Sequence, residues 1–223
     1  MKALLFGSIG TLIETSELQR NAFNLAFQAH GLDWHWERTA YRDMLRDAGG
    51  ADRVMRYADK RGQQVDAARI HQSKSRIFQT ALRHGTLPLR PGVIDTMRYA
   101  KDTGMTLGFV TTTSRANVEA VLEATARSVP VDLFDIVMTR SDVNQPKPDP
   151  ACYQQVIAKL ELQPADIIAV EDNPDGVAAA STAGLRTIAF MGENTRDHRV
   201  PGATAVLTDR LEIDAALLPN VAA

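Results

Sequence analysis

The stretch at residues 167–183, IIAVEDNPDGVAAASTA, decides the fold. Its first four residues are apolar, which indicates a buried strand. Pro174 then opens a helical segment, because proline fits the first turn of a helix. Two adjacent carboxylates, Glu171 and Asp172, stand between the strand and the helix. A strand that passes through polar residues into a helix is the repeating unit of a parallel α/β sheet.

The same unit recurs on both sides of this stretch. Short apolar runs predict further strands at 3–6, 106–110, 134–139, 186–190 and 203–207. Helical spacing predicts helices at 93–103, from Ser114 onward and at 150–160. Ser114 is expected to be an N-cap, and Pro150 to stand at a first helical position. The sequence therefore predicts an α/β fold with a doubly wound parallel sheet.

Residues from about 14 to 84 have a different pattern, because helical spacing continues there without any strand signal. Helical segments are expected at 17–30, 34–45, 51–60 and 67–82. Trp34 and Trp36 are expected to pack inside this insert, since large aromatic side chains dominate core burial. The insert would be joined to the rest by short hinges near Leu12–Ser16 and Thr86–Arg90.

Composition excludes several classes of protein. Of the 223 residues, 44% are hydrophobic and 23% charged, as in soluble globular chains. The net charge of −2 argues against a nucleic-acid binder, and no run approaches the ~18 apolar residues of a membrane span. The single cysteine, Cys152, is expected to be an inert core thiol in a protein of the reducing cytoplasm. The five histidines lack the spacing of metal ligands, so no zinc site is expected.

Polar residues follow the predicted strands, and ligands of doubly wound sheets bind at such strand ends. These residues are Ser8 and Thr11, Thr111 to Ser114, Lys147, and the pair Glu171 and Asp172. Hydroxyls and a lysine suit a phosphate, and paired carboxylates suit Mg²⁺. Each signal also has an ordinary explanation as a helix cap, a solvated lysine or acids at a helix start. Their order at successive strand ends favours one shared site.

Motifs along essentially the whole chain resemble the haloacid dehalogenase (HAD) superfamily. They include Gly10-Thr11-Leu12, Leu89-Arg90-Pro91-Gly92, Thr111-Thr112-Thr113-Ser114, Lys147-Pro148, Glu171-Asp172 and Ala183-Gly184-Leu185. Within the superfamily, the chain is similar to the β-phosphoglucomutase-like group and its CbbY-type sugar-phosphate phosphatases. The resemblance implies a HAD Rossmann-like core domain at 1–13 and 85–223, with an inserted all-helical cap domain at 14–84.

The first motif of the family, Asp-x-Asp-Gly-Thr, is broken here. The resemblance puts Gly7 at the nucleophile position and Ile9 at the position of the general acid and base. Glycine has no side chain and isoleucine has an apolar one, so neither residue can act as nucleophile or as acid and base. Aspartyl-phosphate formation needs a carboxylate. Ser8 lies between these positions. Strand alternation predicts that its side chain points away from them. The sequence also shows no base that could activate the Ser8 hydroxyl as a substitute nucleophile.

The same resemblance implies roles for other residues. Phosphate binding falls to Thr111, Thr112 and Lys147, and substrate binding at the cap to Arg53, Lys74 and Arg90. An exposed helix face is the alternative for these last three. Asp172 and Glu171 would form a weakened metal site, so Mg²⁺ is expected to bind weakly or not at all.

Three functions are compatible with this pattern. In the first, the chain is a homologue that is deficient in phosphoryl transfer but still binds a phosphorylated small molecule or anion, or a protein partner. Alternatively, it is an active HAD-type hydrolase with a non-standard mechanism or substrate. In the third reading, the remaining motifs only stabilise the fold.

Overall fold

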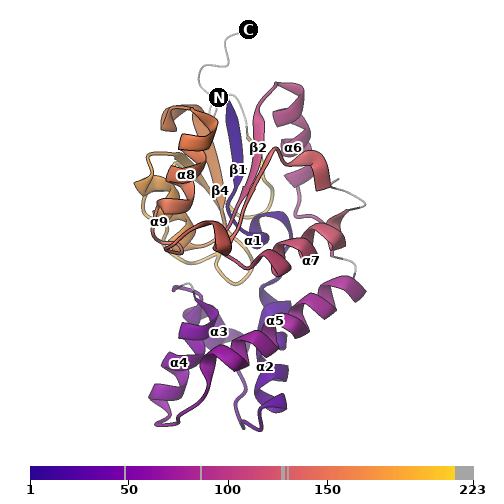
Figure 1. Cartoon of the computed structure of the whole chain (residues 1–223), viewed down its shortest axis with the longest axis vertical. Coiled ribbons are helices and arrows are strands. Elements are labelled where there is room, and N and C mark those ends of the chain that lie inside the picture. Colours follow the sequence, from indigo (N-terminus) through magenta and orange to yellow (C-terminus); the bar gives the residue numbers. More distant parts are fainter. Residues whose placement is uncertain (48, 86, 127–128, 130, 214–223) are drawn as a thin grey trace.

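Six parallel strands form a sheet in this computed structural model, which describes residues 1–213 except 48, 86, 127–128 and 130 (Figure 1). The strand order is β3-β2-β1-β4-β5-β6, so the order reverses at β1. The strands are β1 (Ala3–Phe6), β2 (Thr106–Val110), β3 (Ile136–Met138), β4 (Ile167–Glu171), β5 (Arg186–Phe190) and β6 (Ala205–Leu207). The predicted doubly wound α/β fold is confirmed.

Helices cover both faces of this sheet (Figure 1). They are α1 (Ile9–Leu12), α6 (Val93–Asp102), α7 (Arg115–Thr125), α8 (Ala151–Leu160) and α9 (Pro174–Thr182). Leu4 and Phe6 of β1 share a core cluster with residues of α6 and α7, whereas Ala3 and Leu5 share one with residues of α8 and α9. Because both faces are covered, the strands are apolar on both sides, as parallel sheets require.

Several element boundaries differ from the sequence predictions. β3 and β6 are shorter than predicted, and short 3₁₀ helices occupy Val131–Leu133, Arg140–Asp142 and Pro164–Asp166. Pro150 is the N-cap of α8 and not its first helical residue. Ser114 caps α7 as predicted, since its hydroxyl accepts from the Asn117 N–H. The short helix α1 was not predicted.

The remaining helices, α2 (Ser16–Ala29), α3 (Arg38–Met44), α4 (Gly50–Lys60) and α5 (Ala67–His84), lie together beside the sheet and are called the cap below (Figure 1). Trp34 and Trp36 precede α3, so the predicted helical segment at 34–45 is too long at its start. Both are buried among aromatic rings, with Trp36 4.7 Å from both Phe23 and Phe27 between ring centroids. In the described part of the chain, no helix is long and apolar enough to cross a membrane.

Arg90 ties the sheet to the segment that leads into the cap. Its guanidinium donates to the carbonyls of Gly10 and Phe190 at 2.8 Å and to that of Met191 at 2.6 Å. It also stacks on the Phe190 ring, and its backbone N–H donates to the Leu12 carbonyl at 2.8 Å. Desolvation lowers the pKa of this arginine. Of the two predicted hinges, that at 86–90 is only partly visible, since residue 86 lies outside the described residues.

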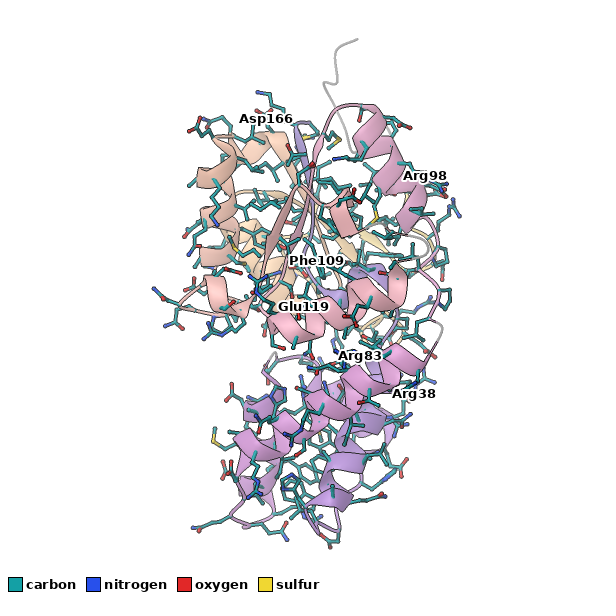
Figure 2. All side chains as sticks on the ribbon, turned by 45° about the vertical axis from the view of Figure 1, so that its right-hand side comes forward. Arg38, Arg83, Arg98, Phe109, Glu119 and Asp166 are labelled. Atoms are coloured by element: carbon teal, nitrogen blue, oxygen red, sulfur yellow. The ribbon has the colours of Figure 1, made fainter. Side chains whose placement is uncertain are left out.

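We expect Arg90→Met to lower the free energy of unfolding by roughly 2–4 kcal/mol, because three buried carbonyls lose their donor. Urea denaturation measures this change. Arg98→Met on α6 is the matched control, because Arg98 is exposed and its loss should change stability by less than about 0.5 kcal/mol (Figure 2). Equal stabilities of the two variants would contradict the role given to Arg90.

Candidate functional site

A cavity of about 1700 Å³ is lined by residues that follow the carboxyl ends of the central strands and by residues of the cap. The sequence-predicted residues that line it are Gly7, Ile9, Thr111, Thr112, Lys147 and Asp172 from the sheet side, and Arg53 and Lys74 from the cap. Glu171 and Arg90 do not line it. The predicted substrate role of Arg90 is not supported by its position, because its guanidinium is bound to the carbonyls described above.

Lys147 lies at the floor of this cavity in a buried ion pair. Its ammonium is 2.5 Å from Glu171 Oε1 and donates to the carbonyls of Gly7 at 2.6 Å and Val110 at 2.8 Å. The Tyr153 hydroxyl donates to the same carboxylate oxygen at 2.6 Å. Burial raises the pKa of Glu171, an effect that the Lys147 ammonium opposes, and burial also raises the pKa of Tyr153. One cation therefore joins the ends of β1, β2 and β4.

Gly7 leaves the space that this pair fills. A Cβ atom placed on Gly7 would lie 2.1 Å from Glu171 Oε1 and 2.4 Å from the Tyr153 hydroxyl, far inside van der Waals contact. Ile9 belongs to the main core cluster as the first residue of α1. The resemblance implies carboxylates at two positions. At the first, the chain has Gly7, which leaves room for the Glu171 carboxylate, and at the second it has Ile9, an apolar core residue.

Ser8 is placed differently from the sequence prediction. Its hydroxyl donates to Asp172 Oδ1 at 2.7 Å, and the residue lines the cavity. Strand alternation does not apply here, because β1 ends at Phe6 and Ser8 is the N-cap residue of α1. The prediction that its side chain points away from the site is therefore wrong. The shared site at the strand ends was predicted, but not the hydrogen bond between Ser8 and Asp172.

The predicted phosphate-binding threonines border the cavity at the end of β2. Thr111 is buried, and its hydroxyl accepts from the Thr113 N–H at 3.2 Å, so its own proton points elsewhere. Thr112 is half-buried. The hydroxyls of Thr111 and Thr112 are the hydrogen-bond donors that this end of the cavity can offer to an anion. The three N–H donors of Lys147 are already bound to Gly7, Val110 and Glu171, so Lys147 contributes only its charge.

At the end of β4, one oxygen of each carboxylate is already hydrogen-bonded, which bears on Mg²⁺ because this ion binds through oxygen ligands. Glu171 Oε1 is bound by Lys147 and Tyr153. Asp172 Oδ1 already receives the Ser8 hydroxyl and the Asn173 amide, the latter at 2.6 Å. The second oxygen of Glu171, Oε2, is buried without a hydrogen-bond partner. Within the described residues, no group of three or more His, Cys, Asp or Glu side chains could hold a metal ion.

The cap contributes buried cations that are bound mainly by neutral oxygens. The Lys74 ammonium donates to Gln19 Oε1 at 2.8 Å and lies 4.9 Å from the ring centroids of Phe23 and Phe78. Burial, with the nearby Arg53, lowers the pKa of Lys74 to about 7. Arg53 donates to the backbone carbonyls of Met44 and Asp47.

His71 also lines the cavity, and burial, together with Lys74 and Arg53, lowers its pKa to about 4. Because its pKa is this low, His71 is neutral near pH 7. No role was predicted for His71 from the sequence, because the histidines lack the spacing of metal ligands and no other pattern marks this residue.

Polar contacts that the sequence did not predict join the cap to the sheet-containing part. Arg38 and Arg42 of α3 pair with Glu193 and Asp197, which follow β5. Asn194 donates to Glu17 at 2.6 Å, and Arg83 of α5 pairs with Glu123 of α7 at 3.1 Å. Figure 2 shows Arg38 and Arg83 along this boundary. These contacts hold the cap over the cavity.

We expect Glu171→Gln to destabilise the fold by about 3–5 kcal/mol, because it leaves the buried Lys147 ammonium without its counter-charge. Urea denaturation at neutral pH measures the change. Glu119→Gln on α7 is the matched control, since Glu119 is exposed and should change stability by less than about 0.5 kcal/mol. A Glu171→Gln protein as stable as the parent would show that the ion pair is dispensable.

The folded-state pKa of Lys74, about 7, lies below its ordinary value of 10.5, so the unfolded chain binds more protons between these pH values. The free energy of unfolding should therefore rise with pH across this window through Lys74. Lys74→Met should flatten that rise, measured as urea midpoints at pH 7 and pH 9. Lys60→Met, at an exposed lysine, should keep it. An unchanged slope in Lys74→Met would refute the linkage.

Comparisons with known proteins show the family of the chain. The family model described as haloacid dehalogenase-like hydrolase matches residues 9–190. Protein CbbY of Rhodobacter capsulatus is 37% identical over 221 residues, which cover 95% of this chain and 97% of the relative. A crystal structure of CbbY from Rhodobacter sphaeroides in complex with phosphate has a TM-score of 0.84 and 38% identity, with 93% of each chain covered.

A mutant of the same Rhodobacter sphaeroides protein, in complex with xylulose-(1,5)bisphosphate, has the same TM-score of 0.84 and the same 38% identity. The family model thus spans most of the chain, and the CbbY relatives align along nearly all of it. The chain belongs to the haloacid dehalogenase-like hydrolases, as a phosphatase-like protein related to CbbY.

Proposed function

We propose that this chain binds the phosphate group of a phosphorylated small molecule and does not hydrolyse it through an aspartyl-phosphate. The observation that carries the proposal is the space beside Gly7, which Glu171 and Tyr153 fill. By the sequence resemblance, the attacking carboxylate of the family would stand at this residue. Loss of a nucleophile that acts within a catalytic unit lowers the rate by about 10⁶ in a well-studied hydrolase.

Phosphate binding would use residues that border the cavity and do not depend on the missing nucleophile carboxylate. The hydroxyls of Thr111 and Thr112 would donate to the phosphate, with the charge of Lys147 nearby, because all three residues line the cavity. Arg53 and Lys74 line it from the cap. The relative from Rhodobacter sphaeroides binds phosphate and xylulose-(1,5)bisphosphate in its crystal structures. We extend only the phosphate-binding chemistry to this chain. We propose that it proceeds without Mg²⁺, because the chain has Gly7 where the family's first metal-binding carboxylate is expected, and donors hold one oxygen of Glu171 and one of Asp172.

Isothermal titration of inorganic phosphate in EDTA tests this proposal. We expect binding at millimolar concentrations or below. Thr111→Val should weaken it roughly tenfold or more, because a hydrogen bond to a charged group contributes about 1.5–3 kcal/mol. Thr182→Val on α9 is the matched control, because Thr182 is exposed and does not line the cavity.

Two results would contradict the proposal. The first is the absence of phosphate binding at millimolar concentration. The second is steady metal-dependent turnover of sugar mono- or bisphosphates by the unmodified chain that Thr111→Val abolishes, since a contaminating phosphatase would be unaffected by that substitution.

A further inference from the structure

Ser8 lines the cavity, and capping of helix α1 does not explain the orientation of its hydroxyl. Ser8 is the N-cap residue of α1, and an N-cap serine usually accepts a hydrogen bond from the first helical N–H groups. Its side chain makes no such bond. The hydroxyl instead donates at 2.7 Å to Oδ1 of Asp172, which follows β4, the strand paired with β1.

Both partners of this hydrogen bond are held in place. The Thr11 hydroxyl donates to the Ser8 carbonyl at 2.6 Å. The Asn173 amide donates to Asp172 Oδ1 at 2.6 Å, while its Oδ1 accepts from the Gly176 N–H at 2.9 Å, which fixes the orientation of the amide. A hydroxyl, a carboxylate that accepts its proton and a third group that orients the carboxylate together form the pattern of an activated nucleophile.

The surroundings favour transfer of a phosphoryl group to this hydroxyl. The Lys147 ammonium donates to the carbonyl of Gly7, the residue before Ser8, and so fixes the backbone next to this hydroxyl. Ser8 lines the same cavity as Thr111 and Thr112. Protein kinases use a similar pair, in which an aspartate accepts the proton of the hydroxyl that receives the phosphoryl group.

We propose that Ser8 is a covalent phosphoryl acceptor with Asp172 as its base, for a small molecule that carries an ester or acyl phosphate. This proposal rests on the phosphate binding proposed above. Ser8 Oγ forms a bond to phosphorus as the bond from phosphorus to the leaving oxygen breaks. The leaving oxygen takes the bonding electron pair, and Asp172 takes the serine proton. An alkoxide leaving group then receives this proton, whereas a carboxylate leaving group departs as the anion.

The product is a phosphoserine, and its hydrolysis would be a second phosphate-ester cleavage. Uncatalysed cleavage of phosphate monoesters is among the slowest known reference reactions. The geometry described here orients Asp172 toward the Ser8 hydroxyl and assigns no base to an attacking water. The modified chain should therefore accumulate to about one phosphoryl group per molecule rather than turn over.

Incubation of the full chain with acetyl phosphate in EDTA tests the proposal, with intact-mass and peptide mass spectrometry as the readout. We expect one phosphoryl group on Ser8 that withstands hydroxylamine, which cleaves acyl phosphates but not phosphoserine. Ser8→Ala should lose the label, and Ser8→Thr, which keeps a hydroxyl, should retain part of it. Asp172→Asn should slow labelling at least tenfold. Ser181→Ala on α9, outside the cavity, should label like the parent.

The outcomes separate this proposal from the proposed binding function. Calorimetric phosphate binding without label on Ser8 overturns the covalent step and leaves the binding function standing. A label that hydroxylamine removes also overturns it, because the acceptor is then a carboxylate. Equal labelling rates in Asp172→Asn and the parent overturn the role of Asp172. Neither binding nor label overturns both proposals.

Discussion

The buried ion pair between Lys147 and Glu171 is the interaction on which the rest of the site depends. It is almost fully shielded from water and joins three neighbouring strands at their carboxyl ends, with Tyr153 as a further partner of the carboxylate. A buried charge is tolerated only when it is paired and hydrogen-bonded, so neither partner is free to leave alone. The pair also uses the space next to Gly7, which makes glycine at that position part of the same arrangement.

The ion pair changes the chemistry that the strand ends can offer. Because Glu171 faces Lys147, the remaining carboxylate, Asp172, is held by neutral donors from Ser8 and Asn173. Gly10 allows this approach, since a Cβ there would lie 1.7 Å from Asp172 Oδ2. At the end of β4, hydroxyl and amide donors thus orient one carboxylate, that of Asp172, whereas the resemblance predicted a pair of metal-binding acids. Its chemistry follows from hydrogen-bonded hydroxyls and a shielded cation.

The cap completes the cavity with charges that water reaches poorly. Lys74 lies between two phenyl rings and Arg53 over Tyr41, and oxygens of Gln19 and of the backbone satisfy their donors. Glu193 and Asp197, which follow β5, pair with Arg38 and Arg42 of α3, the outer cations of the cap. The outer cations therefore position the cap, while the inner ones face the cavity.

The sequence by itself determined the parallel α/β sheet, the helical segment between its first two strands and the strand-end residues of the cavity. Apolar runs, caps and strand-end motifs are local patterns, and the carboxyl ends of parallel strands must meet at one edge. Local patterns do not report which side chains from distant strands pair. Only the tertiary structure decided that Glu171 turns to Lys147, that Arg90 binds carbonyls and that Ser8 meets Asp172. In each case the partner lies far away in the sequence, and burial selects it because an unpaired polar group in the interior is costly.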